Sequence, residues 1–125
     1  MLKTIVLIAV AGAFGAVSRY GTSLGVYSIF GRGFPYGTLF VNVAGSFLMG
    51  ILSIMLLDRF NMGPEWRAAI LVGFLGSFTT FSTFSIETLN LLEQGDFSRA
   101  LLNMALSLSL CIMAVWFGVS VGRQL

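Results

Sequence analysis

Long apolar runs separated by short polar connections dominate the sequence. The runs cover residues 4–27, 35–57, 66–92 and 97–121. Each is at least as long as the roughly 20 residues that an α-helix needs to cross a bilayer. The pattern predicts an all-α membrane protein in which residues 1–125 form one unit of four transmembrane helices, with no linker between domains.

Composition supports a membrane environment and excludes several kinds of site. The chain is 57% hydrophobic and 10% charged, whereas a soluble domain is nearer half apolar and a quarter charged. With no histidine and a single cysteine, Cys111, it has neither the usual proton shuttle nor an intrachain disulfide. The net charge of +2 is too small and too scattered to indicate nucleic acid as a partner. Membrane lipid is therefore the expected surrounding.

The third run, residues 66–92, is unusually long and polar. As a straight helix it would measure about 40 Å, against a hydrocarbon core of about 30 Å. It contains the segment GSFTTFSTFS at residues 76–85, in which phenylalanine recurs at every third position and the residues between are serine and threonine. One interpretation is a helix broken mid-membrane between Gly76 and Thr80, with the hydroxyls satisfying freed backbone groups at a protein-lined site. The other is a continuous helix whose hydroxyls bond their own i−4 carbonyls.

Two phenylalanines of this segment, Phe81 and Phe84, are three residues apart and share a helical face. Ser82 and Thr83 flank them, and Glu87 follows one turn later, where we expect a water-filled mouth. Ring edges carry partial positive charge. Rings presented edge-on would therefore line an anion path without offering a full positive charge, while simple core packing of the rings is the alternative.

Two further runs carry polar side chains at intervals of four, which places them on single helical stripes. These are Thr38, Asn42 and Ser46 in the second run and Asn103, Ser107 and Cys111 in the fourth. An amide inside a membrane needs partners, and its NH₂ donates either to an anion or to a neighbouring helix. Stripes on three helices predict a shared polar track, with interhelical bonding as the alternative.

Charged positions within and between the runs bear on ion access and orientation. Arg19 lies well inside the first run, where an arginine costs on the order of 3 kcal/mol. It either forms an electropositive vestibule or pairs with backbone carbonyls. If both termini lie on one side of the membrane, four basic residues lie on that side and two on the other. This bias weakly favours termini in the cytoplasm, and insertion in both orientations remains open. The first group is Lys3, Arg59, Arg67 and Arg123, and the second is Arg32 and Arg99.

Three sequence blocks, GAFGAVSRY, GTLFVNVAGSFLMG and GFLGSFTTFSTFSIE, closely resemble the Fluc (CrcB) family of fluoride channels. The similarity extends over nearly the whole chain. It implies a non-enzymatic subunit of a bacterial plasma membrane that forms an antiparallel, dual-topology homodimer. It also implies two pores per dimer, passive export of cytoplasmic fluoride, and lower fluoride toxicity as a result.

The resemblance assigns roles to individual residues. Phe81 and Phe84 correspond to the pore-lining rings and Asn42 to the fluoride-donating asparagine. The backbone carbonyls of Gly76 and Thr79 correspond to ligands of a central structural Na⁺. Some relatives have tyrosine in place of Asn103 and serine in place of Cys111, so the track here has fewer hydroxyls. The full predicted pore set is Arg19, Thr38, Asn42, Phe81, Ser82, Thr83, Phe84, Glu87, Asn103, Ser107 and Cys111.

Three other functions fit parts of the pattern. A small multidrug exporter is also a four-helix dual-topology dimer, but it needs a membrane-embedded carboxylate, and the first run has Arg19 and no acid. A non-transporting membrane subunit would use the polar stripes only to join helices. An enzyme is disfavoured because no histidine or lysine stands beside a serine or cysteine to activate it.

Overall fold

The computed structural model describes all residues 1–125, and every regular element in it is helical. Four segments are long and apolar enough to cross a membrane: Leu2–Phe30, Tyr36–Arg59, Pro64–Glu93 and Phe97–Gln124. The predicted all-helical architecture with four candidate spans is therefore confirmed. The observed ends differ from the predicted ones by a few residues.

The first and last spans are single helices, whereas the second and third are composite. The elements in order are α1 (Leu2–Phe30), α2 (Tyr36–Ile54), the π-helical η1 (Met55–Arg59), α3 (Pro64–Ala68), the π-helical η2 (Ala69–Leu75), α4 (Gly76–Phe78), α5 (Phe81–Glu93) and α6 (Phe97–Gln124). Pro64 occupies the first turn of α3, where its missing N–H breaks no helical hydrogen bond. Gly31 and Gly95 end α1 and the α5 segment with φ angles of 82° and 79°, which glycine adopts without strain.

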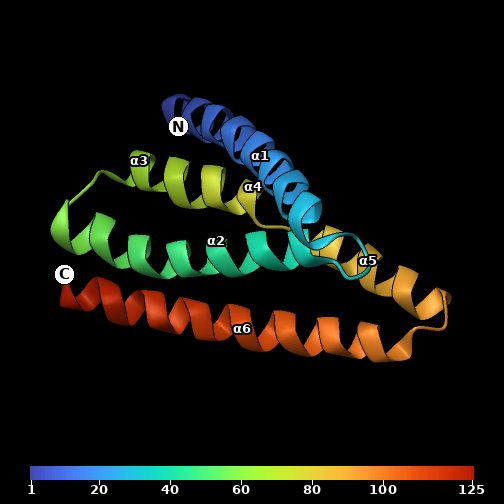
Figure 1. The fold of residues 1–125 in the computed structure, drawn as a ribbon. Helices are drawn as coiled ribbons and strands as arrows, with labels where there is room; N and C mark the ends of the chain where they lie inside the picture. The colour runs from blue at the N-terminus through green and yellow to red at the C-terminus, as the bar shows by residue number, and fades with distance from the viewer.

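Small residues bring the helix backbones into contact. In Figure 1, α2 and α6 lie side by side along most of their length, and α1 crosses beside α3 and α4. A Cβ atom at Gly50 would overlap the carbonyl of Val115, and one at Gly118 would overlap that of Phe47. Such close approach gives the dispersion contacts that hold helices together in a membrane, where burying apolar side chains against lipid-like neighbours gains no hydrophobic free energy.

The third span is interrupted between α4 and α5. Thr79 has φ −90° and ψ 159°, and Thr80 has φ −154° and ψ 120°, so both are extended. Gly76 remains helical, with φ −62° and ψ −30°. The non-helical residues are thus the two threonines and not the glycine expected to supply the unusual angles. Extended dihedral angles suit β-branched side chains, and a bond to another helix, described below, holds Thr80 there.

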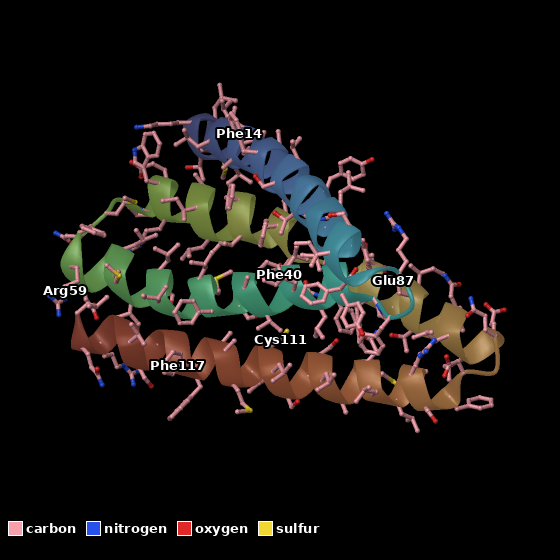
Figure 2. The ribbon with its side chains drawn as sticks, in the orientation of Figure 1. Phe14, Phe40, Arg59, Glu87, Cys111 and Phe117 are labelled. Carbon is pink, nitrogen blue, oxygen red and sulfur yellow. The ribbon has the colours of Figure 1, made fainter.

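Many large apolar side chains face outward. Phe14 on α1 is 65% exposed and Trp116 on α6 is 70% exposed. Figure 2 shows Phe14 and Phe117 on opposite outer sides of the bundle. Single exposed apolar residues are normal on soluble proteins, but whole helices with apolar outer faces fit a lipid-facing surface.

Candidate functional site

A groove of about 290 Å³ lies between α2, the interruption of the third span and α6. It gathers polar groups from three segments that are far apart in the sequence. Its lining includes Asn42, Ser46, Thr79, Thr80, Phe81, Phe84, Ser107 and Cys111. The fold therefore brings the asparagine, both rings and two members of the α6 stripe to one place, and Figure 2 shows Cys111 between α2 and α6.

Asn42 holds the interruption by a reciprocal pair of hydrogen bonds. Its Nδ2 donates to the carbonyl of Thr80 at 2.9 Å, and its Oδ1 accepts from the N–H of Thr80 at 2.7 Å. The Asn42 side chain thus bonds both the backbone N–H and the backbone carbonyl of Thr80, as a neighbouring β-strand would. A primary amide has two N–H donors, so one N–H of Asn42 is left for a further acceptor beside the groove.

Thr80 also starts the next helix. Its Oγ1 accepts a hydrogen bond from the N–H of Thr83 at 3.2 Å, which is the usual way in which threonine caps a helix N-terminus. The hydroxyls of Thr83 and Ser82 lie 3.1 Å and 3.3 Å from the same oxygen. These two predicted pore residues therefore bond locally at the start of α5 and do not line the groove.

The carbonyls of Gly76 and Thr79 are among those that lose their helical partners at the interruption. In a continuous helix, the N–H of Thr80 would bond Gly76 and that of Thr83 would bond Thr79. These N–H groups are turned to Asn42 and to the Thr80 hydroxyl instead. The carbonyls of Gly76 and Thr79, which the resemblance associates with a cation, are released for this local reason, and Gly76 is exposed on the surface of the single chain.

A third carbonyl at the end of α4 is held by Arg19. The Nε of Arg19 donates to the carbonyl oxygen of Ser77 at 2.9 Å. Of the two roles considered for this arginine, pairing with backbone is the one with a contact in the structure. A guanidinium has five N–H donors, so the remaining donors are available to water or an anion near the α4 end.

The two rings differ in exposure although they are close together. Their centroids are 5.3 Å apart with planes tilted by 46°. Phe84 is 8% exposed and packs in the core, whereas Phe81 is 71% exposed. One side of the groove is therefore open in the single chain, and Phe81 projects from that open side.

The other predicted pore residues lie away from the groove. Thr38 and Asn103 are buried in the bundle. Glu87 lines a separate polar cavity of about 320 Å³, together with Tyr27, Arg32 and Arg99. This cavity lies by the loop between α1 and α2 and the connection from α5 to α6. The hydroxyl of Tyr27 donates to Glu87 Oε2 at 3.2 Å, while Oε1 is buried without a partner. Figure 2 shows Glu87 well separated from Cys111.

Sequence reasoning placed Thr80 at the interruption but did not predict its bond to Asn42. It missed two residues that bond predicted pore residues: Tyr27, which bonds Glu87, and Thr88, which bonds Asn103. The available signal for Thr80 was a hydroxyl residue directly before a helical run, which is a typical N-cap. Thr88 lies four residues after Phe84, on the same helical face. Tyr27 gave no signal, because its contact with Glu87 joins residues 60 positions apart.

Comparison with known proteins finds similarity over the whole chain. A family model described as "CrcB-like protein, Camphor Resistance (CrcB)" matches residues 6–119. The fluoride-specific ion channel FluC of Geobacter sulfurreducens is 50% identical over 124 residues, covering 99% of this chain and 100% of the relative. That of Coxiella burnetii is 51% identical over 122 residues, covering 97% and 98%. That of Methylococcus capsulatus is 55% identical over all 125 residues, and the chain spans 55% of that relative's length.

Proposed function

The chain belongs to the CrcB family, and we propose that it is a subunit of a fluoride-selective channel in a bacterial plasma membrane. Its relatives are named as ion channels and not as enzymes. With four apolar helices it is a multi-pass membrane protein. The observation that carries the proposal is the groove that joins the Asn42 amide, the Ser107 hydroxyl and the two phenylalanine rings.

The groove has the donors that a fluoride path requires. Fluoride is small and strongly hydrated, so a pore must replace its water with close hydrogen-bond donors. The free N–H of Asn42, the hydroxyl of Ser107 and the positive ring edges supply such groups. No lysine or arginine lines the groove. An anion held there is therefore not bound too tightly to leave, which conduction requires.

The open side of the groove points to a second chain as the missing wall. Phe81 is 71% exposed beside the interruption, where an identical partner would cover it. An antiparallel two-fold arrangement is compatible with the weak charge bias of the loops. Because the two-fold axis gives each chain an equivalent groove, such a homodimer has two pores, each lined by both chains.

A central Na⁺ fits the carbonyls released at the interruption. One chain offers the oxygens of Gly76 and Thr79, which are too few to replace the water around a cation. A two-fold axis through the interruption doubles them to about four neutral oxygens, a ligand set suited to a hard monovalent cation. The ion would be structural, offsetting the charge of converging carbonyl dipoles on an axis that neither anion path uses. For such an axis to lie in the membrane plane, the interruption must lie at mid-depth.

Transport through this channel is passive. Fluoride enters a cell as the neutral acid and is trapped as the ion. An inside-negative potential drives an anion outward by about 2.3 kcal/mol per 100 mV. A selective pore is therefore enough to lower the cytoplasmic concentration and the toxicity of fluoride.

Growth on fluoride tests this function. Expression of the chain in a bacterium without its own fluoride exporter should raise the fluoride concentration at which growth stops. Ser53→Ala, which removes a hydroxyl that bonds the Gly50 carbonyl on α2 away from the groove, should protect equally well. Equal sensitivity with and without the membrane-inserted protein would refute the proposal.

A further inference from the structure

Asn103 is a buried amide that lines neither of the cavities described above. It is 2% exposed and is among the largest fully buried side chains of the protein. A buried amide is costly unless its polar atoms are hydrogen-bonded. The partners of Asn103 therefore show what holds it in place.

Three hydrogen bonds join the groove to the backbone of α5 through Asn103. The Ser107 hydroxyl donates to Asn103 Oδ1 at 3.4 Å, and Asn103 Nδ2 donates to Thr88 Oγ1 at 2.9 Å. The Thr88 hydroxyl donates to the carbonyl of Phe84 at 2.8 Å. Thr88 is 6% exposed and Ser107 is 7% exposed, so water does not readily substitute for these bonds.

The direction of each bond follows from the chemistry of the groups. The carbonyl of Phe84 only accepts, so it takes the single proton of the Thr88 hydroxyl. Thr88 Oγ1 must then accept from Asn103, which turns Nδ2 toward Thr88 and Oδ1 toward Ser107. Because Oδ1 only accepts, Ser107 has to donate its single proton to Asn103. With the groove empty, the hydroxyl that lines it therefore donates to Asn103.

We propose that Asn103 is a positioning residue that sets when Ser107 donates a hydrogen bond to an anion in the groove. This inference rests on the proposed fluoride path past Ser107. The distance of 3.4 Å is long for an O–H···O bond, whose usual value is about 2.7–2.8 Å. This hydrogen bond is weak, so the Ser107 hydroxyl turns to donate to a stronger acceptor such as fluoride, and it donates to Asn103 again when the anion leaves.

Removal of the resting acceptor tests this role. In Asn103→Leu the Ser107 proton has no side-chain acceptor in the protein, and only the backbone carbonyl four residues earlier competes with an anion in the groove for it. A typical net hydrogen bond corresponds to a factor of about two to ten in an equilibrium constant. We therefore expect the fluoride concentration for half-maximal efflux from proteoliposomes to fall by about that factor. Ser109→Ala, which removes an exposed α6 hydroxyl bonded to Ala105, should leave it unchanged.

A second background separates positioning from a purely structural role. In Ser107→Ala there is no proton to position, so adding Asn103→Leu should not shift the half-maximal concentration further. Thr88→Ser keeps the hydroxyl and should behave as the wild type. If Asn103→Leu does not assemble, Asn103→Ala removes the same acceptor with less bulk.

The outcomes are distinguishable. A wild-type protein that releases no fluoride overturns the proposed function itself. If the wild type conducts, an unchanged or higher half-maximal concentration in the Asn103 variant overturns the positioning role. An equal fall in the Ser107→Ala background overturns it as well.

Discussion

Asn42→Asp separates the structural and conductive roles of one side chain. The aspartate keeps an acceptor for the Thr80 N–H, which lies 2.7 Å from Oδ1 in the wild type. It loses the donor to the Thr80 carbonyl, which Nδ2 reaches at 2.9 Å. An unpaired, partly buried polar group costs about 1–3 kcal/mol. We therefore expect a measurable loss of stability that still leaves the protein folded.

The same change should have a much larger effect on flux. A carboxylate about 4 Å from an anion repels it by about 4 kcal/mol at an effective dielectric constant of 20. Because about 1.4 kcal/mol corresponds to a factor of ten, fluoride efflux should fall by about a thousandfold. Chromatography should show unchanged assembly, a fluoride electrode should report efflux from proteoliposomes, and Ser53→Ala should conduct normally. Wild-type efflux from correctly assembled Asn42→Asp would show that fluoride does not pass this residue.

Three further predictions concern the rings, the packing and the topology. Replacing Phe81 or Phe84 with isoleucine should cut fluoride efflux sharply while the dimer still assembles; undiminished efflux in both variants would make them packing residues. Gly50→Val should lower the free energy of unfolding by about 1–3 kcal/mol, because the valine side chain would overlap the Val115 carbonyl. An unchanged melting temperature in detergent would contradict the α2–α6 contact. After Cys111→Ser, a cysteine added at the C-terminus should react with an impermeant reagent from both sides of the membrane, and labelling from one side only would exclude the antiparallel dimer.

The four spans were predictable because lipid imposes a local requirement. A helix must be apolar over about 20 consecutive residues to cross a bilayer, and this pattern is visible without knowledge of any tertiary contact. A shared polar track was expected from the polar stripes, whose spacing follows from helical periodicity. The choice of Asn42, Phe81, Phe84 and Ser107 within it came from the family resemblance.

The details of the site depend on contacts between distant residues. The interruption falls at Thr79 and Thr80, and not at Gly76, because Asn42 bonds Thr80 across 38 positions of sequence. Arg19 finds its carbonyl partner 58 residues away. Asn103 shares a stripe with Ser107 but turns toward Thr88 on α5. Periodicity places side chains on a face and does not identify the neighbour that each one meets.

Selective efflux from liposomes tests the central claim most directly. Purified protein is reconstituted into vesicles loaded with either potassium fluoride or potassium chloride, and a potassium ionophore is added to remove the opposing voltage. The fluoride-loaded vesicles should empty rapidly while the chloride-loaded ones retain their contents. Equal release of the two anions, or no release of fluoride, would contradict a groove built to conduct fluoride.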